Sequence, residues 1–174
     1  QIGVNENIND ARVYAQLDQL NDDFRRLNAD TTDLWNQAAD MDIEFCLATT
    51  DPDGNPTTGI IRHYISGNSW TKSSFNENVK PYTIWDRDKY LNIWSANLYG
   101  GLLGFGQYPE GPAETDGVVC KFSTFGSIAT PFPIGAPYNM GRTATHEVGH
   151  WLNCHHIWGN NESDCLDSDA VIDT

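Results

Sequence analysis

The chain has 174 residues, of which 39% are hydrophobic and 20% charged, a balance typical of a folded globular domain and not of a disordered segment. Its net charge of −14 argues against a nucleic-acid-binding protein, and no apolar run is long enough to cross a bilayer, so we expect neither nucleic acid nor a membrane as a partner. The acidic balance fits attraction of cations, or simply a solvated acidic surface.

Residues 9–28 carry the clearest helical pattern. Their apolar side chains recur at steps of four, three, four and three, which places them on one helical face: Val13, Leu17, Leu20, Phe24 and Leu27. Asn9 is suited to cap the N-terminus, because its side chain can accept a hydrogen bond from a free backbone N–H group. We expect a scaffold helix here.

Four apolar stretches, at 42–50, 59–65, 90–98 and 117–122, indicate β-strands. The first two flank DPDGNP, at 51–56, a sequence rich in turn-forming residues, so we expect a hairpin. A calcium loop is the alternative for this segment, although it lacks a full ligand set and a closing glutamate. Pro81 is suited to begin a short helix, and strands with interspersed helices predict an α/β or α+β domain.

The four cysteines form no CxxC pair, which argues against a zinc ribbon or a thioredoxin-like site. Four cysteines allow three pairings, and the sequence does not choose among them. Cys46 and Cys120 lie in apolar, strand-like runs, where buried free thiols are common.

A second strong helix is expected from about Arg142, and it contains THEVGHWLNCHHIWG, residues 145–159. Each helical residue advances about 100°, so His146 and His150 share one face and can reach the same metal ion. Glu147 lies one step around the helix, beside that ion. This is the HExxH arrangement, in which two histidines bind zinc and the glutamate takes a proton from metal-bound water.

A further histidine strengthens this interpretation, because HExxH alone also occurs by chance in amphipathic helices. His156 lies ten positions after His146 and supplies a third ligand if the chain leaves the helix near residue 153 and turns back. Asn153 stands at that turn, and asparagine tolerates positive φ better than most residues other than glycine. His155 is one residue off the ligand spacing and is expected to be a bystander at the rim.

HEVGHWLNCHH resembles HExxHxxGxxH, the zinc signature of the metzincin metalloproteases, and GRTATHEVGHWLNCHHIWG resembles the pappalysin family within that clan. The resemblance extends to NINDARVYAQLDQLNDDFRRLNAD, IEFCLAT, YLNIWSANL and DGVVCKFSTFGS, and so covers nearly the whole chain. It implies a mixed twisted sheet with a backing helix and an active-site helix, and zinc in a cleft between two subdomains. The upper edge strand of that cleft binds peptide in extended form.

By this resemblance, the zinc ligands are His146, His150 and His156, and Glu147 is the general base of a secreted zinc endopeptidase acting on peptide or protein substrates. Three neutral imidazoles leave zinc one open position, where bound water acquires a pKa of about 7. Glu147 then takes a proton from that water, which attacks a peptide carbonyl. The alternatives are a non-catalytic fragment that binds zinc or calcium, and a metal-dependent hydrolase with another substrate.

The resemblance also implies parts that this sequence does not contain. Relatives carry a methionine-containing turn after the third histidine, whereas Met41 and Met140 both precede the motif. Relatives also begin with an apolar strand, which Gln1–Glu6 does not resemble. We therefore expect residues 1–174 to be a single catalytic domain without its first strand and its C-terminal methionine-turn subdomain.

CLDSDAVIDT, residues 165–174, resembles the calcium-binding segment after the motif, with Asp169, Asp173 and Thr174 at matching positions. Oxygen donors of this kind suit a hard cation, and an acidic solvated loop is the alternative. Cys165 resembles a cysteine that pairs further along in relatives, so we expect it to be unpaired here or paired with Cys154.

Overall fold

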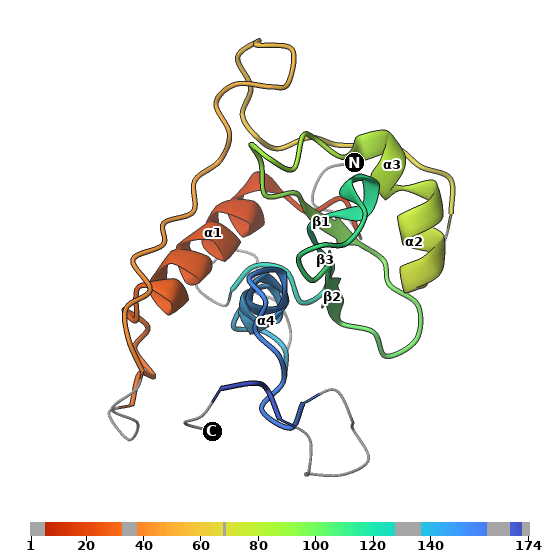
Figure 1. Cartoon of the computed structure of the whole chain (residues 1–174). Helices are drawn as coiled ribbons and strands as arrows, with labels where there is room; N and C mark the ends of the chain where they lie inside the picture. Colours follow the sequence, from red (N-terminus) through yellow and green to blue (C-terminus); the bar gives the residue numbers. More distant parts are fainter. Residues whose placement is uncertain (1–5, 33–37, 68, 128–136, 160–167, 172–174) are drawn as a thin grey trace.

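In the computed structural model, the described residues are 6–32, 38–67, 69–127, 137–159 and 168–171 (Figure 1). Their regular elements, in chain order, are α1 (Asp10–Phe24), α2 (Lys72–Asn78), α3 (Lys80–Thr83), β1 (Ile93–Ala96), β2 (Gly104–Gly106), the 3-10 helix η1 (Ala113–Thr115), β3 (Val118–Lys121) and α4 (Arg142–Trp151). None of the described helices combines the length and the apolar character that crossing a membrane requires.

β1, β3 and β2 form a three-stranded mixed sheet, in that spatial order. β3 runs parallel to β1, with Val119 opposite Trp94, and antiparallel to β2, with Val119 opposite Phe105. β2 is an edge strand, because only one of its sides pairs with a described strand. The mixed sheet with interspersed helices confirms the predicted α/β class.

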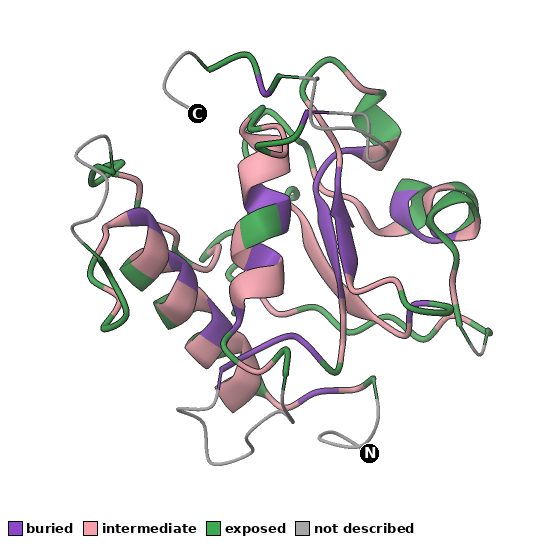
Figure 2. Ribbon diagram, turned by 90° about the horizontal axis from the view of Figure 1, so that it is seen from below, coloured by how far each residue is buried: buried purple, intermediate pink, exposed green. Residues whose placement is uncertain are grey.

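Apolar clusters cover both faces of the sheet, because successive side chains of β3 point to opposite sides. Val118 and Cys120 belong to the cluster that also includes side chains of α1 and α4, and Val119 belongs to the cluster around Phe75 of α2. Figure 1 accordingly shows α1 and α4 on one side of the sheet, and α2 and α3 on the other. Figure 2 shows buried residues on β2 and β3 and on the sides of α1 and α4 that face the core, whereas β1 is only partly buried.

The cluster under α2 and α3 encloses a buried cation. Lys80, at the start of α3, is 0% exposed, and its Nζ donates a hydrogen bond to the carbonyl oxygen of Thr115 at 2.7 Å. The same Nζ lies 5.1 Å from the ring centroids of both Trp94 and Phe105, a distance typical of cation–π contacts. Burial lowers the pKa of Lys80 to about 8, because desolvation disfavours the charged form.

α1 begins as predicted but ends four residues earlier. The side chain of Asn9 accepts a hydrogen bond from the N–H of Arg12 at 3.0 Å, which confirms the N-cap. At the other end Arg26 adopts a φ of 53°, and the N–H of Leu27 donates to the carbonyl of Asp22, a Schellman-type reversal. Leu27, predicted on the apolar face, is therefore 71% exposed.

The first two predicted strands are wrong, whereas the last two are confirmed as β1 and β3. Neither 42–50 nor 59–65 forms a strand, and an isolated bridge joins Thr50 to Pro56 across the turn. The turn itself forms as expected, since the carboxylate of Asp51 accepts two backbone N–H bonds within it. The hairpin is thus reduced to its turn and one bridge.

One reason why residues 42–50 form no strand is that a side chain of α1 makes the hydrogen bonds that a neighbouring strand would make. The amide of Asn21 donates to the carbonyl of Phe45 at 3.0 Å, and its oxygen accepts from the N–H of Phe45 at 2.7 Å. These bonds satisfy backbone groups that a ladder would otherwise use.

Three elements, α2, β2 and η1, were not predicted, whereas the short helix at Pro81 was. α2 begins with a capping box between Thr71 and Ser74, but its seven residues are too short for a helical period to be recognised. β2 lies within a stretch rich in glycine, which is typical of loops. Pro81 stands in the first turn of α3, as expected.

Candidate metal centre

α4, which carries the histidine motif, is anchored at its start by α1. The buried side chain of Gln16 donates to the carbonyl of Gly141 at 3.0 Å and accepts from the N–H of Gly126 at 2.9 Å. The hydroxyl of Thr145 donates to the carboxylate of Asp23 at 2.6 Å. These bonds fix the helix against the scaffold helix before the first histidine is reached.

α4 ends in a tight reversal at the position that the sequence predicted. Asn153 has a φ of 74°, its N–H donates to the carbonyl of His150, and the N–H of Cys154 donates to the carbonyl of Gly149. These two bonds form a Schellman motif, in which a residue with positive φ closes the helix. The following segment is thereby directed back toward the face of α4 that carries His146.

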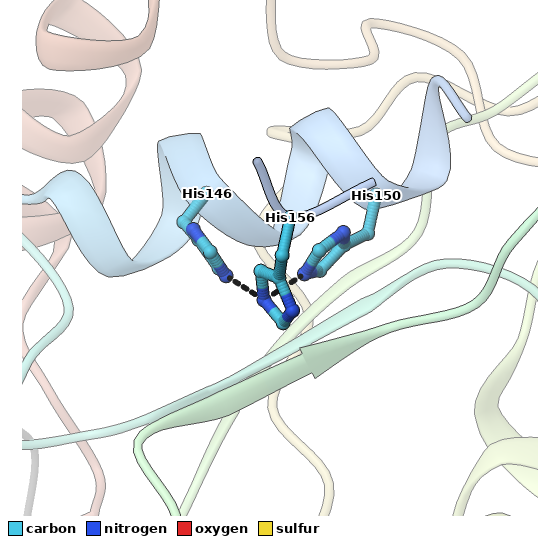
Figure 3. Close-up of side chains that lie close together, drawn as sticks. All are labelled: His146, His150 and His156. Atoms are coloured by element: carbon cyan, nitrogen blue, oxygen red, sulfur yellow. Dashed lines mark hydrogen bonds between the residues drawn. The ribbon is translucent and has the colours of Figure 1, made fainter. Parts of the chain in front are cut away.

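The three histidines of the motif meet at one point (Figure 3). The Nε2 atom of His156 lies 3.1 Å from the Nε2 atom of His146 and 3.1 Å from that of His150. Two nitrogens bound tetrahedrally to zinc at about 2.0–2.1 Å would lie about 3.3 Å apart. The spacing and the all-imidazole donor set therefore fit a zinc-sized cation, and these residues could hold one.

The protonation of the rings also suits metal binding. The Nδ1 atom of His150 lies 2.8 Å from the carbonyl oxygen of Cys154, which can only accept, so Nδ1 carries the proton and Nε2 keeps its lone pair. Burial lowers the pKa of His146 and of His150, and repulsion between the neighbouring rings acts in the same direction, while the hydrogen bond to Cys154 raises that of His150. These shifts favour the neutral imidazole, which is the form that binds metals.

The side chain of Glu147, a residue of α4, packs against the edge strand β2, and Glu147 is only 7% exposed. Burial raises the pKa of its carboxyl to about 7, while a hydrogen bond from the backbone of Gly106 and the charge of Lys72 act in the opposite direction. A carboxyl group with a pKa near neutral pH is suited to act as a general base.

Two glycines of β2 allow this close approach. A Cβ atom on Gly104 would lie 2.9 Å from Cγ of Glu147, and one on Gly106 would collide with the backbone carbonyl of Glu147. Both contacts exclude larger residues, since real Cβ atoms do not come so close to their neighbours. The sequence did not predict this role, and its only sign was the repeated glycine at Gly104 and Gly106.

A hollow of about 350 Å³ lies in front of the histidines, and Trp158 contributes to its wall. The Trp158 ring stacks on His156 at 4.7 Å between centroids, which supports the third histidine from the outside. A second hollow, of about 370 Å³, lies between α1 and β1, away from the histidines. Among the described residues, only the histidine cluster brings three metal-binding side chains together.

The calcium prediction falls mostly outside the described residues. Asp173, Thr174 and Cys165 are not among them. Asp169 is described, is 8% exposed, and its carboxylate accepts a hydrogen bond from the N–H of Val171 at 3.0 Å. The calcium site therefore stays a prediction.

The three described cysteines are free thiols. Cys120 is buried, as predicted, and burial raises the pKa of its thiol. Cys46 is exposed, so the prediction that it is buried is wrong, because 42–50 does not join the sheet. Cys154 is exposed beside the histidines and forms no disulfide with a described residue.

Comparison with known proteins identifies relatives of this chain. The extracellular metalloprotease of Arthroderma benhamiae is 27% identical over 173 residues, which cover 99% of this chain and 54% of that protein. The extracellular metalloprotease of Arthroderma otae is 38% identical over 86 residues, or 48% of this chain and 31% of that protein. The chain thus spans about half or less of the curated relatives it matches.

Among solved structures, mature mirolysin of Tannerella forsythia in complex with a cleaved peptide superposes with a TM-score of 0.88 at 42% identity, covering 97% of this chain and 65% of that chain. The absence of a first strand and of a methionine-containing turn from residues 1–174 stays a prediction. A sequence profile of the M43 peptidases, described as pregnancy-associated plasma protein-A, matches residues 73–174, more than half of the chain. By this match and by its fold, the chain belongs to that family, the pappalysins of the metzincin clan.

Proposed function

We propose that this chain is the catalytic part of a secreted zinc endopeptidase, with His146, His150 and His156 as the zinc ligands and Glu147 as the general base. The observation that carries the proposal is that three histidine Nε2 atoms meet beside α4, the helix that also carries the buried Glu147. The relatives named extracellular metalloproteases, and mirolysin with its cleaved peptide, support both the secretion and the peptide substrate.

The residues of the chain divide the chemical work among them. Zinc in such a site supplies Lewis acidity, which polarises a carbonyl group and makes water more acidic. Glu147 accepts the proton of the attacking water and then delivers it to the leaving amine nitrogen. The backbone of Gly106 acts on the Glu147 carboxyl and lowers its pKa, while burial, which leaves Glu147 7% exposed, raises it to about 7.

The edge strand β2 supports a peptide as the substrate. One side of β2 pairs with β3, and its other side pairs with no described strand. An extended peptide can add to such an edge through backbone hydrogen bonds, which do not depend on the peptide's side chains. A peptide bound there would lie beside Glu147, because Gly104 and Gly106 contact that residue.

The test is the substitution Glu147→Gln, which keeps the shape of the side chain and removes the base. Hydrolysis of internally quenched peptides should fall by about 10²–10⁴-fold, while one zinc per chain is retained. Glu114→Gln, at an exposed glutamate of η1, is the matched control and should leave the rate unchanged.

Unchanged peptide hydrolysis by the Glu147→Gln variant would overturn the role of the base. A wild-type chain that binds zinc but cleaves no peptide would establish the non-catalytic alternative. Faster cleavage of simple esters than of any peptide would favour a hydrolase with another substrate.

We also propose that Asp169, Asp173 and Thr174 bind calcium. The resemblance of residues 165–174 to a calcium-binding segment supports this, and oxygen donors of this kind suit a hard cation. Calorimetric titration with calcium should show one site that Asp169→Asn removes, and Asp88→Asn, at an exposed aspartate, should leave it intact. Calcium binding that survives Asp169→Asn would exclude this residue as a ligand.

A further inference from the structure

The two consecutive histidines after the turn at Asn153 have different neighbours. His156 lies against the other two histidines of the cluster, with its ring 5.1 Å from that of His146. His155 instead stacks on the ring of Tyr108, at 5.0 Å between centroids and 22° between planes. The histidine that the motif leaves without a role is therefore in contact with a tyrosine from another part of the chain.

Tyr108 lies between two histidines. It follows β2 closely in sequence, and its ring is 5.2 Å from that of His150 and 5.0 Å from that of His155. Its hydroxyl oxygen lies 3.1 Å from Nδ1 of His150. The contact joins residues 42 positions apart, so no local pattern in the sequence predicts it.

The direction of this hydrogen bond follows from its second partner. The carbonyl oxygen of Cys154 lies 2.8 Å from the same Nδ1 and can only accept, so Nδ1 is the donor and the Tyr108 oxygen is a second acceptor. Nδ1 is the ring nitrogen that faces away from the histidine cluster, since Nε2 is the atom that meets His156. Tyr108 thus contacts His150 from behind and does not reach the metal position.

We infer that Tyr108, held by the stacked ring of His155, is a positioning residue for His150. Two oxygen acceptors on one N–H keep His150 in the tautomer with a free Nε2 and restrict rotation of its ring, which lowers the cost of binding a metal. The inference rests on the proposed zinc ligands.

Zinc affinity tests the inference directly, without peptide hydrolysis. The metal-free chain is titrated with zinc in competition with a chromophoric chelator, for the wild type, Tyr108→Phe, His155→Ala and the control Tyr82→Phe, whose ring is 79% exposed on α3. Tyr108→Phe should weaken zinc binding by about 3–10-fold, below the 10–100-fold usual for losing such a partner, because the Cys154 carbonyl remains. His155→Ala should weaken it less, and Tyr82→Phe should not change it.

A second readout separates positioning from a general loss of structure. Thermal unfolding of the metal-free chain should be the same for Tyr108→Phe and the wild type, since phenylalanine keeps the ring. With cobalt in place of zinc, the visible absorption bands of Tyr108→Phe should shift, because the angle of one ligand changes, and those of Tyr82→Phe should not.

Wild-type zinc affinity and an unshifted cobalt spectrum in Tyr108→Phe would overturn the inference. A metal-free Tyr108→Phe chain that unfolds at a clearly lower temperature would overturn it too, by assigning Tyr108 a structural role. If the wild type itself bound no zinc, the proposed function would fail and this inference with it, so the two failures are distinguishable.

Discussion

On each face of the sheet, burial moves the pKa of one side chain toward neutral pH. Glu147, on the face of α4, has a pKa of about 7, and Lys80, on the face of α3, has a pKa of about 8. Their surroundings differ. Lys80 contacts two aromatic rings and a carbonyl oxygen and is influenced by the charge of Asp116, whereas Glu147 lies next to three converging histidines and an edge strand.

This difference shows that a shifted pKa does not by itself indicate a functional group. Lys80 has no open position at which a substrate could meet it, since it is 0% exposed. Glu147 is 7% exposed, and two of the three histidines that could hold a metal ion lie on its own helix. We therefore expect Lys80 to stabilise the fold and Glu147 to take part in the proposed chemistry, and each of the following changes tests that expectation.

Lys80→Ala should have the largest effect on stability. It removes a fully buried side chain and leaves the Thr115 carbonyl without this donor, so the free energy of unfolding should fall by about 2–4 kcal/mol. Urea unfolding measures this, with Lys89→Ala, at an exposed lysine, as the control. Zinc affinity of the folded variant should match the wild type; a tenfold loss would mean that Lys80 belongs to the metal centre.

The pH dependence of stability should have opposite signs for the two residues. Lys80 has a lower pKa when folded than its ordinary value of 10.5, so between pH 8 and 10.5 the unfolded chain binds the extra proton and stability rises with pH. The contribution reaches up to about 3 kcal/mol across that window. Comparing the wild type with Lys80→Met at pH 7.5 and pH 10 isolates it, and a constant difference between the two proteins would contradict it.

For Glu147 in the metal-free chain the sign is reversed. Its pKa is raised from 4.5 to about 7 on folding, so between these values the folded chain holds the extra proton and stability falls as the pH rises. The wild type should lose up to about 3 kcal/mol relative to Glu147→Gln across this window. Urea unfolding at pH 5 and pH 7.5 checks this, and a wild type that gains stability relative to the variant would refute it.

Gly106→Ala should disturb the Glu147 side alone. The new methyl group would collide with the Glu147 carbonyl and lie 3.3 Å from Cβ of His150, which should cost about 1–3 kcal/mol and reduce peptide hydrolysis. Gly101→Ala is the control, because a Cβ there meets nothing within 4 Å. Equal activity of the two variants would show that contact between β2 and α4 is not needed to hold the base.

Lys72→Gln should have the smallest effect and should reach both faces. The charge of Lys72 lowers the pKa of Glu147 and also that of Lys80. Its removal should therefore raise both pKa values by a few tenths, as expected for charges screened by solvent. A ¹³C NMR titration of the two side chains measures this, and a shift confined to one of them would show that Lys72 influences that face only.

The sequence predicted the histidine cluster because a helical period and one turn determine it. His146, His150 and His156 lie within eleven residues, and Asn153 takes the positive φ that the spacing requires. The end of α1 uses the same reversal with Arg26, and the sequence did not indicate it, because arginine gives no signal for positive φ.

What the sequence did not reveal depends on contacts between distant residues. The packing of Gly104 and Gly106 on Glu147, and of Tyr108 on His150, joins segments about 40 residues apart, and no local period records them. The strand predicted at 42–50 does not form for a similar reason, because the side chain of Asn21 hydrogen-bonds the backbone N–H and carbonyl of Phe45.

The reversal at Asn153 also has a consequence for the order of folding. Because it brings the third histidine back within six residues of the second, closing the three-histidine cluster costs little chain entropy. The contacts of Glu147 and Tyr108 with β2 and its following segment must instead wait for the sheet to dock, which is a slower, non-local event. If the three histidines bind zinc as proposed, a chain still assembling its sheet could already hold the metal, and Glu147 would reach its final surroundings later, when β2 packs against it.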